Sequence, residues 1–176
     1  VTFRRNAIFS DEFLLWSDNI EKYPNLSRPY SNIGYFYILH DQKDKALEYF
    51  IKAKDLDKFS NTQIKAITEY NLGLLYYHEG QYDLALSYLE RAHTLHPSNS
   101  MTSVYKANIL LLKGEYNAAH TLIEPLARKH PKNTRLNELF CLILFKEKKF
   151  AEAEDHAKKF LKRNLFSTFP LPILAE

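Results

Sequence analysis

Residues 71–97 read NLGLLYYHEGQYDLALSYLERAHTLHP, and residues 105–131 read YKANILLLKGEYNAAHTLIEPLARKHP. At an offset of 34 residues, the two stretches agree at Gly80 and Gly114, Tyr82 and Tyr116, Ala85 and Ala119, and Pro97 and Pro131. The same step leads from Ala119 to Ala153. A fixed period of this length indicates a repeat protein, in which each repeat is one supersecondary unit.

An earlier repeat follows the same pattern at a longer offset. Gly34 lies 39 residues before Gly73, and Ala46 lies 39 residues before Ala85. One insertion of about five residues, near residues 61–65, accounts for the difference. Ser60 and Gln63 have the S-x-x-Q spacing of a capping box, so we expect the insertion to lengthen the N-terminus of a helix.

Within each repeat the apolar residues have helical spacing. In residues 66–99 the apolar positions that recur every three to four residues include Ile67, Tyr70, Leu74 and Tyr77. Gly80 then interrupts the pattern. Glycine is the residue that most often adopts the left-handed conformation at the end of a helix. Ala85 and its equivalents fall where two helices would cross, because a small side chain lets the backbones approach. The sequence therefore predicts antiparallel helix pairs.

These positions resemble the tetratricopeptide repeat (TPR), which favours an aromatic residue, Leu-Gly, Tyr, Ala, an aromatic residue or Leu, Ala and Pro in that order. The second repeat matches best, with Leu72, Gly73, Tyr76, Gly80, Tyr82, Ala85, Leu89, Ala92 and Pro97. The resemblance implies an all-α fold, a right-handed superhelical stack of antiparallel helix pairs of the TPR-type α-solenoid. We divide the chain into repeat 1 (27–60), an insertion plus repeat 2 (61–99), repeat 3 (100–133) and a degenerate capping repeat 4 (134–167).

The two ends of the chain depart from the repeat pattern. We expect residues 1–26 to be a leading segment that includes the helix of a degenerate repeat, from Phe9 to Lys22. Residues 168–176 form a tail in which Pro170 and Pro172 disfavour a further helix. We expect the apolar residues of this tail to cover the end of the last helix pair.

The leading segment carries a second resemblance. Thr2, Arg4-Arg5-Asn6, Trp16 and Tyr23-Pro24 are similar to the junction of multi-spanning membrane proteins with a C-terminal extracytoplasmic repeat domain, many of which resemble lipid-linked sugar transferases. This resemblance implies a membrane tether through a missing N-terminal region and favours the periplasmic or extracytoplasmic side over the cytoplasm. Because the chain starts at Val1 without an initiator Met, we expect it to be a piece of a longer protein. No apolar run in it reaches the roughly 18 residues of a membrane-spanning helix.

Composition narrows the possible partners. The 24 Lys and Arg residues against 21 Asp and Glu residues give a net charge of +3, which is too small to predict a nucleic-acid partner. The densest basic stretch, 158–163, falls at the end of the last expected helix, where cations complement the helix dipole. The single cysteine, Cys141, excludes an internal disulfide, and its apolar neighbours indicate a packed thiol.

Stacked helix pairs line a concave surface with their first helices. The ligand-binding residues that we expect on this surface are Arg28, Asn32, Tyr35, Tyr70, Asn71, Tyr77, His78, Tyr105, Asn108 and Arg135. Asn32 and Asn71 share a repeat position, and an amide there can both donate to and accept from a peptide backbone. The alternative is that these asparagines bond the neighbouring helix and that several of the tyrosines belong to the core.

Other binding and catalytic chemistry lacks the residues it needs. The carboxylate clamp of chaperone-binding TPR proteins requires a basic pair where this chain has Met101 and Tyr105. His93 and His96 have metal-ligand spacing but no evident third ligand, so we expect neither a metal nor a cofactor. No phosphate loop, nucleophile elbow or zinc-protease motif occurs, and we do not expect an enzyme.

The leading functional hypothesis is a non-catalytic scaffold that binds a protein or an extended peptide, and not nucleic acid, on the concave face of a TPR array. The alternative is an accessory domain that positions the acceptor of a membrane glycan-transferring protein. A third possibility, an RNA- or anion-binding repeat, would use the C-terminal lysines and would show a steep salt dependence.

Overall fold

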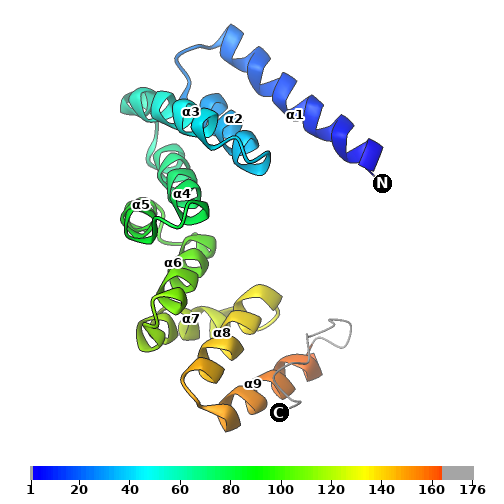
Figure 1. Cartoon of the computed structure of the whole chain (residues 1–176), viewed down its shortest axis with the longest axis vertical. Helices are drawn as coiled ribbons and strands as arrows, with labels where there is room; N and C mark the ends of the chain where they lie inside the picture. The colour runs from blue at the N-terminus through cyan, green and yellow to red at the C-terminus, as the bar shows by residue number, and fades with distance from the viewer. Residues whose placement is uncertain (1, 164–176) are drawn as a thin grey trace. The chain divides into compact units, whose positions relative to one another are not determined.

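The computed structural model describes the backbone of residues 2–163 and the side chains of residues 12–58 and 60–162. Within that part of the chain all regular structure is helical. The helices (Figure 1) are α1 (Thr2–Lys22), α2 (Ser27–Leu39), α3 (Lys43–Leu56), the 3-10 helix η1 (Asp57–Phe59), α4 (Thr62–His78), α5 (Tyr82–Leu95), α6 (Ser100–Leu112), α7 (Tyr116–Lys129), α8 (Thr134–Lys146) and α9 (Phe150–Arg163). The all-α prediction is confirmed. The tail at residues 168–176 lies outside the described residues.

The helices form two compact units, residues 1–99 (unit 1) and 100–176 (unit 2). In unit 1, α2 pairs with α3 and α4 pairs with α5, while α2 also packs beside α4. In unit 2, α6 pairs with α7 and α8 pairs with α9, while α6 also packs beside α8. Each unit thus contains two helix pairs, and the first helices of its pairs are neighbours.

Small residues bring the paired helices of unit 1 close together. A Cβ atom added to Gly34 would lie 2.5 Å from Phe50 Cε1, and one added to Gly73 would lie 2.8 Å from Leu89 Cγ. Ala85 is fully buried on the same helix as Leu89. In unit 2, Ala119 and Ala153 are equally buried. The alanines therefore lie in the core. This agrees with their shared spacing, which predicted that they lie where helices cross.

The turns within the pairs use one left-handed residue each. Gly80 and Gly114 have φ angles of 73° and 77°, whereas Asp41 and Lys148 occupy the same turn in the other two pairs at 54° and 63°. A side chain in this region costs about 1–2 kcal/mol. Two of the four turns therefore carry a strain that glycine would relieve.

The insertion before repeat 2 adds helix, but not with the expected cap. Helix α4 has 17 residues where α2 has 13, and the additional turn lies at its N-terminus. The capping box proposed for Ser60 and Gln63 is wrong. Asn61 is the N-cap, and its Oδ1 accepts a hydrogen bond from Ile64 N at 2.9 Å. Ser60 ends η1, and its hydroxyl lies 2.6 Å from that of Ser27.

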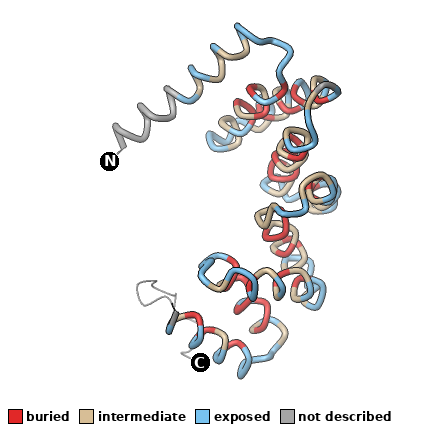
Figure 2. Tube along the Cα trace, turned by 180° about the vertical axis from the view of Figure 1, so that it is seen from behind, coloured by how far each residue is buried: buried red, intermediate tan, exposed pale blue. Residues whose placement is uncertain are grey.

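Within unit 1, the leading helix α1 packs on α2. Helix α1 begins at Thr2, earlier than the expected Phe9. The Phe13 ring lies 5.1 Å from that of Phe36 and 6.0 Å from that of Tyr37, between centroids. In both units the buried residues lie where helices face one another (Figure 2). Phe50, Leu72 and Leu75 are central in unit 1.

Candidate peptide-binding faces

Each unit has a side on which its first helices are turned away from the second helices. Gly34 and Gly73 mark the opposite side, because they contact α3 and α5. Residues about a third of a turn or more round the helix from those glycines face outward. We call this outward side the first-helix face of each unit.

In unit 1 the first-helix face contains several of the predicted residues. Arg28, Tyr35 and His78 are exposed, and Asn32 is half-buried among them. Tyr70 and Tyr77 are also half-buried, but they lie three residues before and four residues after Gly73, on the same side of α4 as that glycine. The Tyr77 ring lies 6.2 Å from that of Tyr82 on α5. Both tyrosines therefore lie outside the first-helix face.

Asn71 differs from the expectation. It is only 5% exposed, and its Nδ2 donates to Ser31 Oγ on α2 at 3.1 Å. The amide thus ties the two first helices of unit 1 together, as in the alternative reading of the asparagines. Because little of its surface reaches solvent, we leave Asn71 out of the candidate face.

In unit 2 the structure brings Tyr105 and Arg135 together. The guanidinium carbon of Arg135 lies 5.3 Å from the centre of the Tyr105 ring, which joins α8 to α6 by a cation–π contact. Asn108 lies one turn after Tyr105 and is half-buried, while Arg135 is exposed. An aromatic surface, an amide and a cation are therefore neighbours on one face.

Three apolar residues on these faces were not predicted. Leu39 is 53% exposed, Leu112 is 59% exposed and Leu142 is 40% exposed. Leu39 and Leu112 share the repeat position of His78, and Leu142 shares that of Tyr35 and Asn108. Their repeat positions could have revealed them from the sequence. Both positions were already assigned to the binding surface through His78, Tyr35 and Asn108.

An ion-pair cluster holds the first helix α4 in unit 1. Glu69 on α4 lies 3.0 Å from Lys54 Nζ on α3 and 3.0 Å from Arg91 Nε on α5. Both cations also lie against the Tyr88 ring, at 4.9 and 4.2 Å from its centre. Because the Glu69 carboxylate is largely shielded from water, removing both cations would leave a shielded charge without compensation, which is destabilising.

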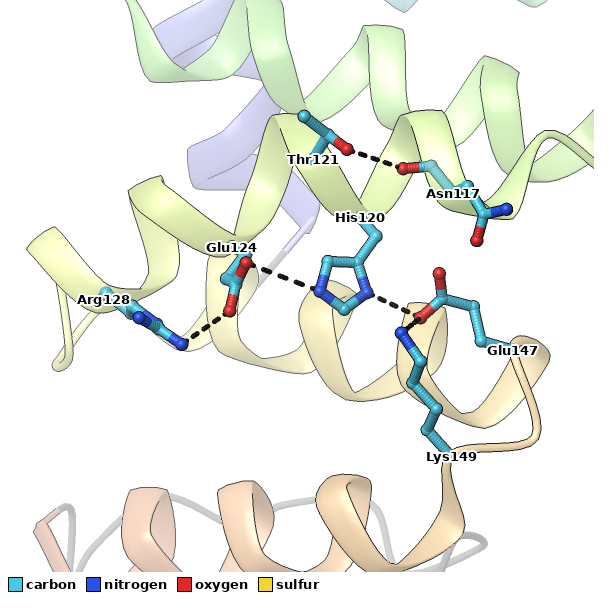
Figure 3. A network of polar contacts seen from close by, with 7 residues as sticks. All are labelled: Asn117, His120, Thr121, Glu124, Arg128, Glu147 and Lys149. Carbon is cyan, nitrogen blue, oxygen red and sulfur yellow. Dashed lines mark hydrogen bonds and ion pairs between the residues drawn. The ribbon is translucent and has the colours of Figure 1, made fainter.

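A second polar cluster joins α7 to the turn before α9 in unit 2 (Figure 3). His120 Nδ1 lies 2.6 Å from Glu147 Oε2, and Lys149 Nζ lies 3.1 Å from the same oxygen. The other ring nitrogen of His120 lies 3.5 Å from Glu124, which also pairs with Arg128 at 2.7 Å. These contacts fix the end of α8, the helix that presents Arg135 and Leu142.

The buried carboxylate of this cluster makes stability depend on pH. Burial raises the pKa of Glu147, but the hydrogen bonds from His120 and Lys149 outweigh it and hold the pKa below its ordinary value. A carboxyl whose pKa is lower in the folded state stabilises the fold above its unfolded pKa of about 4.3. That contribution is lost as the pH falls through the lower folded pKa.

We expect Glu147→Gln to lower the free energy of unfolding by about 1–3 kcal/mol at neutral pH, because charge-assisted hydrogen bonds are lost. The deficit relative to the parent should shrink as the pH falls below about 4. Urea denaturation of both proteins at several pH values measures this difference in the free energy of unfolding. Glu12→Gln, at an exposed residue of α1, is the control and should follow the parent throughout. A deficit that stays constant down to pH of about 3 would contradict the assignment.

Comparisons with known proteins place this geometry in a family. Two tetratricopeptide-repeat family models match residues 25–98 and 76–140, together more than half of the chain. The chain belongs to the tetratricopeptide repeat family. No curated protein sequence matches it. The predicted TPR-type α-solenoid is thereby confirmed.

Solved TPR structures share the fold at low sequence identity. YrrB, described as a TPR protein with an unusual peptide-binding site, aligns with a TM-score of 0.69 and 19% identity over 85% of this chain and 74% of its own. PilF of Pseudomonas aeruginosa aligns with a TM-score of 0.75 and 17% identity over 92% of this chain and 71% of its own. MamA aligns with a TM-score of 0.71 and 20% identity over 96% of this chain and 92% of its own. At these identities the likeness establishes the fold alone.

The buried cysteine and two of the C-terminal lysines are held in structural contacts. Burial, with a smaller contribution from Glu138, raises the pKa of the Cys141 thiol to about 11, so the reactive thiolate is scarce at neutral pH. Lys158 and Lys159 pair with Glu154 and Asp155 on their own helix.

The described residues provide neither a metal-binding cluster nor a membrane-spanning helix. No group of three or more His, Cys, Asp or Glu residues there is arranged to hold a metal ion. No helix in that part of the chain combines the length and the apolarity that membrane crossing requires.

Proposed function

We propose that this TPR chain is a non-catalytic scaffold that binds a protein, through an extended peptide segment, on its first-helix faces. The observation that carries the proposal is the recurrence of exposed apolar and aromatic side chains at two repeat positions. Tyr35 and Leu142 share one of them, and Leu39 and Leu112 share the other. Burying such residues against a partner is favourable by about 25 cal/mol per Å².

The polar residues of the faces fit the same partner. An extended peptide presents backbone donors and acceptors, which the Asn32 and Asn108 amides can match in both directions. The tyrosines add apolar area with a polar tip. YrrB, which has the same fold and is described as having a peptide-binding site, supports a peptide as the ligand class.

The two arginines support a binding role because a cation at either position does not stabilise its own helix. Arg28 and Arg135 share a repeat position and lie in the first turns of α2 and α8. A cation near a helix N-terminus costs about 0.3–1 kcal/mol through the helix dipole. The helix dipole therefore accounts for neither arginine. Arg135 contacts Tyr105, and attraction of a carboxylate on a partner accounts for a cation at both positions.

The proposal is tested by selecting ligands without assuming their identity. Displayed libraries of unstructured peptides are panned against the purified chain, and the enriched peptides are titrated by calorimetry. We expect saturable binders that combine apolar residues with at least one Asp or Glu, with affinity that falls modestly in salt. Selection of no binder from such libraries, or of basic peptides only, would contradict the proposal.

A further inference from the structure

A surface pocket of about 370 Å³ lies between α2 and α3 of unit 1, outside the first-helix face. Its lining residues are Tyr30, Glu48, Tyr49, Ile51, Lys52 and Asp55. All except Tyr30 belong to α3, the second helix of its pair. The volume is at the lower end of the range of small-molecule sites, which is about 300–1,000 Å³.

Two tyrosine rings form one wall of this pocket. The Tyr30 and Tyr49 rings lie 6.3 Å apart between centroids and are inclined by 37°. The Tyr30 hydroxyl donates to the Pro24 carbonyl oxygen at 3.0 Å, which anchors that ring. Behind them the Tyr37 ring lies 5.4 Å from Tyr49. Two electron-rich rings therefore line the pocket, and the Tyr37 ring packs against one of them.

This cluster already binds a cation of its own chain. Lys45 Nζ lies 5.4 Å from the centre of the Tyr37 ring. Elsewhere in unit 1, Tyr88 receives both Lys54 and Arg91. Tyrosine faces in this unit are therefore used as cation sites, and the rings of Tyr30 and Tyr49 line the open pocket.

The charges around the pocket favour a cation as well. Glu48 and Asp55 are exposed at its edge, and Lys52 stands between them on the same helix. Among the described residues, no ion pair within 4 Å joins Lys52 to either carboxylate. Burial raises the pKa of Tyr49, and the nearby Tyr37, Glu48 and Tyr30 raise it further. Burial disfavours a charge of either sign, so the attraction for a cation comes from the two carboxylates, Glu48 and Asp55, against the one lysine.

We propose that this pocket binds an organic cation of the methylated or quaternary ammonium class. Aromatic faces attract such a cation by their quadrupole, and its weak hydration lowers the cost of leaving water. Glu48 and Asp55 neutralise the bound charge. Lys52 opposes the ligand, so its removal strengthens binding.

The test compares choline with its uncharged isostere 3,3-dimethyl-1-butanol, using nuclear magnetic resonance of the tyrosine rings. We expect choline to shift the Tyr30 and Tyr49 signals saturably and to bind about tenfold more tightly than the isostere. Glu48→Gln combined with Asp55→Asn should weaken choline binding several-fold, and Lys52→Ala should strengthen it. These side chains are exposed, so the variants keep the fold. Leu84→Ala, at an exposed position of α5 outside the pocket, is the control and should bind choline like the parent.

The source of the ammonium group is distinguished by a second comparison. A peptide containing trimethyllysine that binds more tightly than choline, while its unmodified lysine form does not, identifies a methylated protein side chain as the ligand. Equal affinity of choline and the methylated peptide identifies a small ammonium compound. Equal binding of choline and its isostere, or no saturable shift of either tyrosine, overturns the proposal. Choline affinity that stays unchanged in all three charge substitutions also overturns the proposal.

Discussion

Replacing Phe50 with alanine should lower the free energy of unfolding by about 3–5 kcal/mol, the largest stability effect that we expect in this chain. Phe50 is fully buried, and its ring lies against α2 at Gly34. Alanine would leave a cavity between the two helices of the first pair. Urea denaturation followed by circular dichroism measures the change.

A substitution at Gly34, the residue that Phe50 contacts, tests the same packing from the other helix. Gly34→Ala in the parent should cost about 1–3 kcal/mol, because the new Cβ overlaps the Phe50 ring. In the Phe50→Ala background the same change should be neutral or stabilising, because the methyl group enters the cavity and alanine favours helix over glycine by about 1 kcal/mol. Tyr35→Ala, at the next and exposed residue, is the control and should add independently to Phe50→Ala. Additive effects of the Gly34 and Phe50 changes would show that the two residues do not meet.

Replacing Tyr105 with alanine should weaken binding of a selected peptide by about 2 kcal/mol, or roughly 30-fold. The ring offers apolar area on the first-helix face of unit 2 and holds the Arg135 guanidinium against it. Its loss therefore removes a contact and frees a second side chain. Calorimetric titration, with variants compared at matched thermal stability, measures the effect.

Two controls separate binding from folding at this position. Tyr105→Phe keeps the ring and the cation–π contact, so it should retain most of the affinity. Lys159→Ala removes an exposed charge of α9 that pairs with Asp155, and it should leave binding unchanged. If Tyr105→Ala is silent while Lys159→Ala abolishes binding, the ligand occupies another surface.

The fold could be predicted from a few spacings because each has a steric reason. Gly34, Gly73, Ala85 and Ala119 lie where helices approach too closely for larger side chains. Any sequence that keeps those contacts in successive repeats must keep the small residues at one period. The turn positions were less visible, since Asp41 and Lys148 adopt the left-handed conformation that glycine usually signals.

The candidate site was less predictable because it depends on pairs of residues from different helices. The register placed Asn71 on an outward position, but its bond to Ser31 depends on how α2 and α4 meet. Leu39 and Leu112 have the apolar character of core residues, although they share the repeat position of His78, and their accessibility shows that they belong to the surface. The contact between Arg135 and Tyr105 likewise joins positions that no local pattern connects.

The most direct test of a peptide on the first-helix faces is site-specific photo-cross-linking. A photoreactive amino acid is placed at Leu142 in one variant and at Leu84 in another, because both side chains are exposed and Leu84 belongs to the second helix α5. Each variant is irradiated with a peptide obtained by selection. We predict a cross-linked product from position 142 and none from position 84. Cross-linking from position 84 but not from position 142 would contradict the proposed function.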